Sequence, residues 1–397
     1  MGNNTVRPDR YRSQRGVPLH NQEELANSIL ILGGFGTGNQ PVGVLSSMAG
    51  VGHIIVLDPD PRVEWHNLSK SLALFRETDL GKSKAELAGP RLMEFNSEIQ
   101  AVGLGSELKR TGDAVYRHAD CIASFPDSPD ARVDAAKKAI MWNIPHVDGA
   151  MGEGETARNI SVSVFMPGHD EPCFACPLSK EQLKNGGVRT SCADGESMQG
   201  GPSGAMLTSS AFKAAGFMFE QIARILMGSE PTLKGMQLYY TDASHRLEVM
   251  KIRRNPECVV HDIERPEVLF VPFDGETTAG ELHEIVRAEL GAGEPFTLYS
   301  DRLIAYGVRC KSCDRKAAEA MLAHALADVE NTASCCGGQL SAADQTMMIR
   351  PVSVKLSEIG VDVLHDVILR LDSGYSCHVG SSRVRTRDQF IAHLYGT

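Results

Sequence analysis

In the first half of the chain, short apolar runs alternate with segments whose apolar residues recur at helical spacing. Residues 28–32 form one such run and lead into a glycine cluster, residues 41–49 have the spacing of a helix, and residues 54–57 form a second, β-branched run. A run, a tight turn, a helix and a second run predict one βαβ unit of a parallel sheet.

The alternation continues along the chain and predicts a Rossmann-like, doubly wound α/β sheet. We expect helices over 84–95 and 130–142, a buried strand over 118–125 and another that starts at 146. From residue 159 the pattern changes and predicts an antiparallel half. It contains a strand over 160–165, a long amphipathic helix over 205–227, and a hairpin formed by 235–240 and 246–252.

A Pro/Glu-rich segment after residue 262 indicates a domain boundary. We therefore expect an N-terminal arm over 1–27, a nucleotide-binding domain over 28–262 and a smaller α+β module over 266–397. A chain of 397 residues is long enough for this number of domains.

Composition places the chain among soluble globular proteins, with 42% hydrophobic and 23% charged residues. A net charge of -10 argues against nucleic acid or an anionic membrane as a partner. The longest apolar runs are far shorter than the roughly 20 residues of a membrane helix, and the polar N-terminus lacks the apolar segment of a secretory signal. We expect a cytoplasmic protein whose ten cysteines are metal ligands, reactive thiols or buried apolar residues.

The glycine cluster, residues 33–38, lies between the first predicted strand and the first predicted helix. Such a turn lets the backbone approach a phosphate, whose charge is favoured at the N-terminus of the following helix. Asp58 ends the second strand, where a carboxylate can bind the hydroxyls of a ribose. These features predict a nucleotide site and leave NAD and ATP equally open.

Further polar segments follow in order: residues 58–70 (DPDPRVEWHNLSK), residues 79–84 (DLGKSK), and Asp127-Ser128 with Arg132. With the glycine turn, and over about residues 10–262, they resemble the ThiF/MoeB/HesA family, the bacterial relatives of ubiquitin-activating enzymes. Family members carry G-x-G-G-x-G, D-x-D, N-L-x-R-Q, D-x-G-x-x-K and T-D-N-x-x-x-R motifs in the same order.

The resemblance implies an adenylyltransferase that uses ATP and Mg²⁺ to activate a carboxylate and releases pyrophosphate, for sulfur transfer or conjugation. The usual substrate is the C-terminal glycine of a ubiquitin-like sulfur-carrier protein, and a peptide is the other expected partner. A C-terminal carboxylate is already ionised at neutral pH, so the reaction needs positioning and charge neutralisation rather than a general base.

The resemblance also assigns roles to individual residues. The glycine turn would consist of Gly33, Gly36 and Gly38, with Asp58 at the ribose, Asn67, Lys70 and Lys84 at the phosphates, and Asp127 on Mg²⁺. Asp60, the second acidic residue of the D-x-D motif, is also expected to bind the nucleotide. In the family an N-terminal arginine reaches into the neighbouring subunit's active site. Arg12 is our candidate for that arginine, with Arg15 as the other choice, and either implies a homodimer; the alternative is that the basic arm is simply solvated.

Three residues depart from the family pattern: Phe35 replaces the central glycine of the turn, and Lys70 and Ser71 replace the Arg-Gln pair. Lysine keeps the charge of arginine but loses its planar bidentate fork. A catalytically degenerate scaffold that binds a partner is therefore an alternative. A dinucleotide-dependent oxidoreductase is a further alternative, although hydride transfer does not require Lys84, Asp127 or cysteine pairs in this arrangement.

Two short cysteine motifs, Cys173-x-x-Cys176 and Cys258-x-x-His261, match a tetrahedral structural zinc site in the antiparallel half. Cys192 lies where family members carry a cysteine on the loop that crosses the active site, and we consider it for covalent transfer. In the C-terminal module, a second zinc site is suggested by Cys310, Cys313, Cys335 and Cys336.

Overall fold

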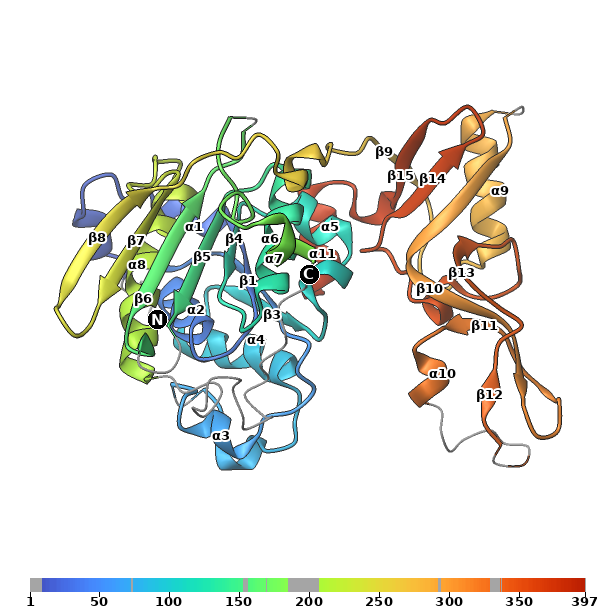
Figure 1. Cartoon of the computed structure of the whole chain (residues 1–397), viewed down its shortest axis with the longest axis horizontal. Coiled ribbons are helices and arrows are strands. Elements are labelled where there is room, and N and C mark those ends of the chain that lie inside the picture. Colours follow the sequence, from blue (N-terminus) through green and yellow to red (C-terminus); the bar gives the residue numbers. More distant parts are fainter. Residues whose placement is uncertain are drawn as a thin grey trace, which may run out of the picture. The chain divides into compact units, whose positions relative to one another are not determined.

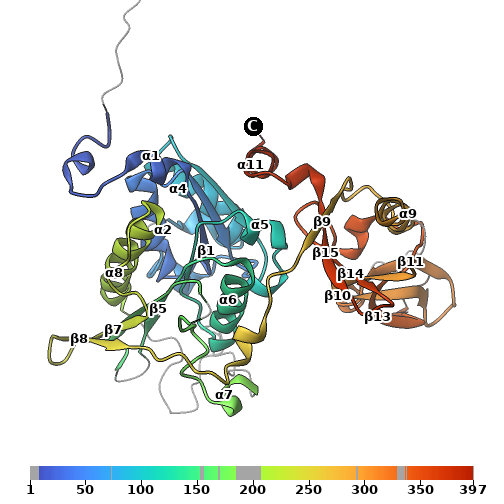
Figure 2. The same ribbon diagram turned by 90° about the horizontal axis from the view of Figure 1, so that it is seen from above.

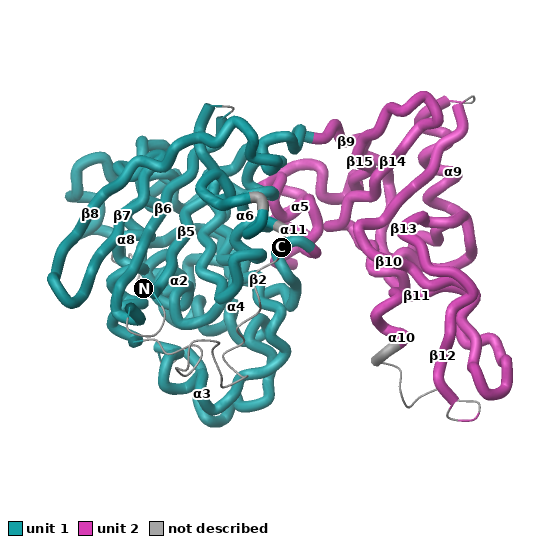
Figure 3. The backbone as a smooth tube through the Cα atoms, in the orientation of Figure 1, with its two compact units in different colours: residues 1–109, 119–265 teal, residues 110–118, 266–397 magenta. Residues whose placement is uncertain are grey.

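The computed structural model describes residues 9–72, 74–152, 156–168, 170–184, 207–291, 294–328, 336 and 338–396. The chain divides into two compact units (Figure 3). Unit 1 consists of residues 1–109 and 119–265, and unit 2 consists of residues 110–118 and 266–397. Residues 110–118, which lie inside the predicted nucleotide-binding domain, thus group with the C-terminal residues.

Unit 1 contains an eight-stranded sheet, counted over the described residues, with the strand order β3-β2-β1-β4-β5-β6-β7-β8 (Figure 1). Its strands are β1 (Ile29–Gly33), β2 (His53–Leu57), β3 (Gln100–Leu104), β4 (Cys121–Ser124), β5 (His146–Met151), β6 (Ile160–Phe165), β7 (Met236–Thr241) and β8 (Arg246–Lys251). The first five of these strands are parallel to one another, and β6 to β8 run antiparallel. This confirms the predicted Rossmann-like sheet that continues into an antiparallel half.

Helices cover the two faces of this sheet, which explains why its central strands are apolar throughout. The helices of unit 1 are α1 (Gln22–Asn27), α2 (Asn39–Ala49), α3 (Trp65–Leu68), α4 (Lys84–Phe95), α6 (Pro129–Trp142), α7 (Lys180–Lys184) and α8 (Thr208–Leu226). Figure 2 shows α2 and α8 on one face and α6 on the other. All five residues of β1 are buried, as expected for a parallel strand covered on both faces.

The main packed face of α8 shows how the sequence specifies this arrangement. Ala214, Ala215, Met218 and Ile222 recur at helical spacing, are buried, and belong to the same apolar cluster as Val162 of β6. The small alanines allow the helix to lie close to the sheet.

Unit 2 is built on a second sheet, of order β11-β10-β14-β15-β9, with β12 and β13 also paired to β10. The strands are β9 (Val268–Val271), β10 (Phe296–Cys310), β11 (Lys316–Leu322), β12 (Leu340–Ser341), β13 (Asp344–Ile349), β14 (Val367–Leu371) and β15 (Ser376–Ser381). Its helices are α9 (Ala279–Leu290), α10 (Ala325–Asp328) and α11 (Arg387–Tyr395). Phe273, Leu282, Leu298 and Val379 are among the buried residues of its own core.

Unit 2 also contains α5 (Asp113–Arg117), which lies in sequence between β3 and β4 of unit 1. The N–H of Ala114 donates to the carbonyl of Leu364 at 3.1 Å. Arg117 forms an ion pair with the fully buried carboxylate of Asp366 at 2.6 Å. His378 Nδ1 lies 3.4 Å from Asp113 and 3.6 Å from Asp366. Unit 2 is therefore assembled from two separate stretches of the chain.

Within the described ranges, no helix combines the length and the apolar character that a bilayer-spanning segment needs.

Candidate nucleotide site and cysteine clusters

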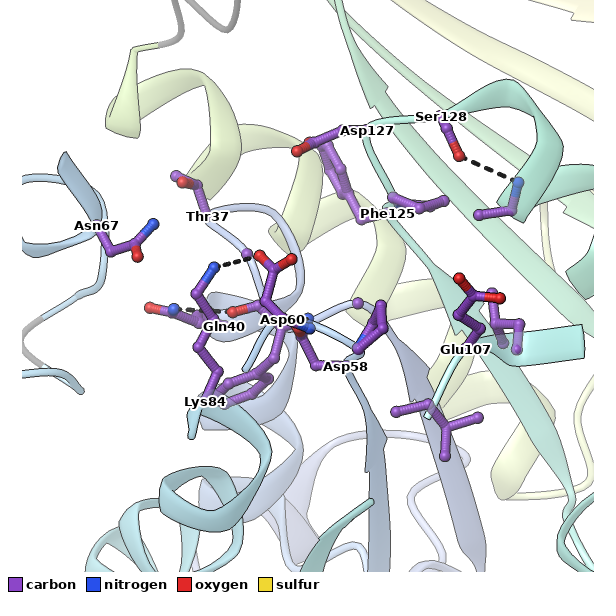
Figure 4. A pocket seen from close by; sticks show the side chains of 18 of the residues that line it. Thr37, Gln40, Asp58, Asp60, Asn67, Lys84, Glu107, Phe125, Asp127 and Ser128 are labelled. Atoms are coloured by element: carbon purple, nitrogen blue, oxygen red, sulfur yellow. Dashed lines mark hydrogen bonds and ion pairs between the residues drawn. The ribbon is translucent and has the colours of Figure 1, made fainter. Parts of the chain in front are cut away.

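A cavity of about 590 Å³ opens in unit 1 where β1, β2 and β4 end. Its walls come from the loops after these strands, from the segment around α3 and from the start of α4 (Figure 4). The carboxyl ends of parallel strands are the usual ligand site of a doubly wound sheet. The sites predicted from the glycine turn and from Asp58 therefore fall in one place.

The glycines of the turn after β1 have different surroundings. Gly34 has a φ of +83°, a backbone conformation that glycine adopts readily and that would be strained in a residue with a side chain. Gly36 lines the cavity, and a Cβ there would meet nothing within 4 Å, so its backbone is open to a ligand. Gly33 and Gly38 do not line the cavity. A Cβ on Gly38 would lie 2.2 Å from the ring of Phe125, so this glycine allows close packing.

Asn39 and Gln40, at the start of α2, hold the turn in shape. The buried Asn39 amide donates to the carbonyls of Gly33, Gly34 and Ala123, at 2.9, 3.0 and 3.2 Å. The Gln40 amide donates to the carbonyl of Phe35 at 3.0 Å. These bonds tie the turn to β4 and keep the N-terminus of α2 at the cavity.

Phe35, which replaces the family's central glycine, directs its side chain into the apolar core. Its ring is fully buried and makes an edge contact with Phe75, with centroids 6.2 Å apart. Its N–H donates to Asp58 at 2.6 Å. The large residue thus fills core volume on the protein side of the turn, and the cavity remains open beside it.

Asp58, Asp60 and Lys84 form a charged group on the cavity wall (Figure 4). Asp58 is buried and accepts from the N–H groups of Phe35 and Asp60, at 2.6 and 2.8 Å. Burial raises the pKa of Asp58, and the Lys84 charge opposes that shift. Lys84 Nζ lies 2.5 Å from Asp60, and its side chain is only 8% exposed. Lys84 is thus a fixed positive charge at the cavity.

Asn67, Lys70 and Asp127 also line the cavity, as the sequence predicts. Asn67 caps its own short helix, because its side-chain oxygen accepts from the N–H of Glu64 at 2.8 Å. Asp127 is exposed at the loop after β4. All the predicted nucleotide residues except Gly33 and Gly38 are therefore brought together around one space.

Sequence reasoning missed several lining residues, including Arg62, Glu107 and Lys109. Arg62 lies inside the family-like segment 58–70, but the family motifs do not assign it a role in binding. Glu107 and Lys109 follow β3, a strand we did not predict. The available signal was topological, since the end of a third parallel strand beside β2 must come to the same edge of the sheet.

Two arginines of the family motifs, Arg12 and Arg132, do not line the cavity. Arg12 is exposed on the N-terminal arm. That arm is anchored by its neighbour Tyr11, whose hydroxyl accepts from Asn96 at 2.7 Å. Arg132, quoted with Asp127 in the family motif, instead pairs with the buried Asp148 at 3.0 Å.

The Arg132–Asp148 pair belongs to a buried polar network behind the cavity. Ser124 donates to Asp148 at 2.6 Å and lies 2.7 Å from His146 Nε2. Since the hydroxyl has one hydrogen, its oxygen accepts from Nε2–H of His146. Burial, together with the Arg132 charge, lowers the pKa of His146 to about 3, so the ring is neutral.

Cys173, Cys176, Cys258 and His261 form a four-donor cluster in unit 1. The donor atoms lie within 4.8 Å of one another, and the Sγ atoms of Cys173–Cys176 and Cys173–Cys258 are both 3.8 Å apart. Zn–S bonds of 2.3 Å in a tetrahedron require an S–S separation of about 3.8 Å. A hydrogen bond from Cys173 lowers the pKa of Cys176, which favours a thiolate in this cluster. These donors fit a closed tetrahedral zinc site.

Two cysteines with predicted roles, Cys192 and Cys335, lie outside the described residues. The other predicted ligands of the C-terminal module are close together, since Cys310, Cys313 and Cys336 have sulfur atoms within 4.8 Å of one another.

A sequence model of the ThiF family matches residues 11–260. The sulfur carrier protein adenylyltransferase of Thermus thermophilus is 27% identical over 256 residues, which cover 64% of this chain and 90% of that protein. The sulfur carrier protein ThiS adenylyltransferase of Escherichia coli is 27% identical over 174 residues, covering 43% of this chain and 66% of that protein. The crystal structure of E. coli MccB with ATP shares the fold, with a TM-score of 0.51 and 21% identity over 65% of this chain and 75% of that chain.

Proposed function

The chain belongs to the ThiF family and is an adenylyltransferase of the ubiquitin-activating-enzyme type, and from this premise we propose that it activates the C-terminal carboxylate of a ubiquitin-like sulfur-carrier protein or a peptide. The reaction would consume ATP and release pyrophosphate. The observation that carries the proposal is the cavity that brings the glycine turn, Asp58 and four arginine or lysine side chains together.

The position of the nucleotide follows from the walls of this cavity. The open backbone at Gly36 and the N-terminus of the eleven-residue helix α2 suit the phosphates, which carry the negative charge. Asp58 directly follows β2 and would accept hydrogen bonds from the ribose hydroxyls, because its carboxylate oxygens keep lone pairs beyond those used by the two backbone N–H groups. The α-phosphate then lies between the turn and the basic side chains.

The chemistry of the cavity suits nucleophilic attack by a carboxylate. The carboxylate oxygen attacks the α-phosphorus, one P–O bond forms, and the P–O bond to the leaving pyrophosphate breaks. Lys84, Lys70 and Arg62, which line the cavity, would neutralise the charge that builds up on the phosphate oxygens. Because Lys84 is fixed by Asp60, little reorganisation is needed when that charge develops.

The cavity also has several acidic side chains, among them Asp127, Asp130 and Glu107. Carboxylates beside a triphosphate would repel it unless a hard cation lies between them, and Mg²⁺ prefers such oxygen donors. Asp127 would hold the ion, which supplies charge neutralisation to the phosphates. The donor set therefore fits ATP with Mg²⁺.

The buried cysteine cluster has a structural role in this proposal. Cys173, Cys176, Cys258 and His261 would hold Zn²⁺ as a closed tetrahedron with no free position for a substrate. The ion would join the Cys173 loop to the segment after β8, where Ala136 of α6 and Val260 also pack. Its contribution would be to folding rather than to adenylylation.

The proposal includes a homodimer, in which the N-terminal arm of each copy reaches the nucleotide cavity of the other. Arg12 does not line the cavity of its own chain, so it could act only at the cavity of a second copy. The relatives named above are adenylyltransferases of sulfur carrier proteins, which supports a carrier with a flexible C-terminal tail as the substrate.

The test is ATP–pyrophosphate exchange with purified protein, Mg²⁺ and carriers or peptides that end in a free carboxylate. We expect exchange that depends on one such partner, and a loss of about 100-fold or more in Lys84→Met and Asp127→Ala. Lys251→Ala, an exposed lysine on β8, is the matched control and should retain exchange. Full exchange in the Asp127 variant would overturn the metal assignment. ATP binding without exchange, for any partner, would favour the scaffold alternative.

A further inference from the structure

Three cysteines of unit 2 converge at the tip of a β-hairpin. Cys310 ends β10, Cys313 lies in the turn before β11, and Cys336 belongs to the segment that leads to β12. The sulfur atoms lie within 4.8 Å of one another, and Cys310 Sγ is 3.4 Å from Cys336 Sγ. Cys310 is buried, whereas Cys313 and Cys336 are exposed.

The backbone around the three thiols is closely packed. The N–H of Lys311 donates to the carbonyl of Gln339 at 2.8 Å. A Cβ on Gly338 would lie 2.3 Å from Ser312 Oγ and 2.9 Å from Cys310 Sγ. Only a glycine lets the segment after Cys336 approach the turn this closely, and this approach brings the third sulfur to the other two.

Apolar packing explains only part of this convergence. Leu298, Ile304 and Tyr306 of β10 belong to the main apolar core of unit 2, and the side chains of Val308 and Cys310 are also buried. Gly307 has a φ of +61°, and the pairing of β10 with β11 shifts register after Val308. β11 begins with exposed residues, and β12 consists of Leu340–Ser341 alone. Because most of the described residues at this end of the hairpin are at least partly exposed, another source of stability is favoured.

We propose that Cys310, Cys313 and Cys336 bind a thiophilic divalent cation, zinc in the cell, which fixes the tip of the β10–β11 hairpin. The Cys-x-x-Cys turn supplies two thiolates, and the glycine-rich segment supplies the third from a different part of the chain. Three converging thiols also fit a metal better than a disulfide, which would use two of them and leave the third without a role. This site is independent of the nucleotide cavity and of the buried cluster in unit 1.

The experiment measures zinc in the full chain purified under reducing conditions, by inductively coupled plasma mass spectrometry. Wild-type protein should contain about two zinc ions per chain, one for each cluster. Cys313→Ala and Cys336→Ala should each lose one of them, whereas Cys313→His, which keeps a donor atom, should retain it. Since Cys313 is exposed, its replacement leaves the core intact. Cys377→Ser, a buried cysteine of the same unit outside the cluster, is the control.

A second readout is limited proteolysis of the wild-type protein. Removal of the exposed ion by a chelator should speed cleavage within residues 310–341, and added zinc should restore protection. Zinc content equal to wild type in both Cys313→Ala and Cys336→Ala would overturn the proposal. One zinc in the wild type that Cys313→Ala loses and Cys173→Ser keeps would support this site and reject the buried one, so the two assignments fail separately.

Discussion

Each unit buries an arginine–aspartate pair beside a histidine, and the two histidines respond to burial in opposite ways. In unit 1, burial lowers the pKa of His146 to about 3. In unit 2, burial also acts to lower the pKa of His378, but the carboxylates of Asp113 and Asp366 more than offset it and raise the pKa to about 9. The same side chain is therefore neutral in one unit and charged in the other.

The difference follows from the charged groups that lie beside each histidine. Asp148 has Arg132 on one oxygen and the Ser124 hydroxyl on the other, which leaves no carboxylate for His146. In unit 2 His378 lies beside two carboxylates, those of Asp113 and Asp366, so a positive charge on its ring is favoured even though Asp366 also pairs with Arg117. Local charge balance, and not burial alone, thus decides the protonation of a buried histidine.

The largest expected effect comes from removing either arginine. Arg117→Met and Arg132→Met each leave a buried carboxylate without its partner, and each should cost about 3–5 kcal/mol of unfolding free energy. Hydrogen exchange measured by mass spectrometry should localise each loss to its own unit. Arg76→Met removes an exposed pair with Glu94, both side chains being more than half exposed, and should cost under about 1 kcal/mol. Equal costs in all three variants would contradict the comparison.

The next effect is the alkaline response of unit 2. The folded pKa of His378 is raised above the unfolded value of 6.5, so its contribution is fully present below pH 6.5 and is lost as the pH rises through about 9. The loss should amount to roughly 3 kcal/mol. Urea unfolding at a series of pH values measures it. His378→Gln should make this part of the profile flat, and an unchanged profile would show that the imidazolium is not the cause.

A smaller and opposite response is expected from unit 1. The folded pKa of His146 is depressed from 6.5 to about 3, so folding disfavours the proton and stability falls as the pH drops below 6.5. By about pH 5 the loss should reach about 2 kcal/mol. Hydrogen exchange of β4 and β5 as the pH is lowered would report it. If hydrogen exchange of β4 and β5 rises as steeply at low pH in His146→Gln as in the wild type, protonation of His146 is not the cause.

The smallest effect concerns the hydroxyl between His146 and Asp148. Ser124→Ala removes one hydrogen bond to the carboxylate and one from the imidazole, and should cost about 1–2 kcal/mol. Thermal unfolding measures the change. Ser161→Ala changes a half-buried serine on β6 of the same sheet and is the control. A similar loss of unfolding free energy in both variants would show that the hydrogen bonds of Ser124 contribute little to stability.

The periodic parts of the fold could be predicted from the sequence, and the parts that depend on distant partners could not. The helix Lys84–Phe95 and the strand Ile160–Phe165 have the predicted bounds, because their apolar spacing is local. β3 escaped prediction since it contains Gly103 and only one of its residues, Ala101, is buried.

The same distinction holds for the candidate site. Asp58, Lys84 and Asp127 belong to short segments of recognisable order, and they all line the cavity. The ion pair between Arg132 and Asp148 joins helix α6 to strand β5, so no local sequence pattern around Arg132 predicts it.

The helix Asp113–Arg117 limits how the gene of this protein can be cut. Since this helix is encoded within the nucleotide-binding region but completes the C-terminal unit, residues 266–397 are not a cassette that can be removed or transplanted by one cut. A product that stops at residue 265 would keep Arg117 and lose Asp366, and a transplanted 266–397 would carry Asp366 without Arg117. Inheritance of the two units is therefore linked, and an exchange between relatives would need breakpoints on both sides of residues 110–118.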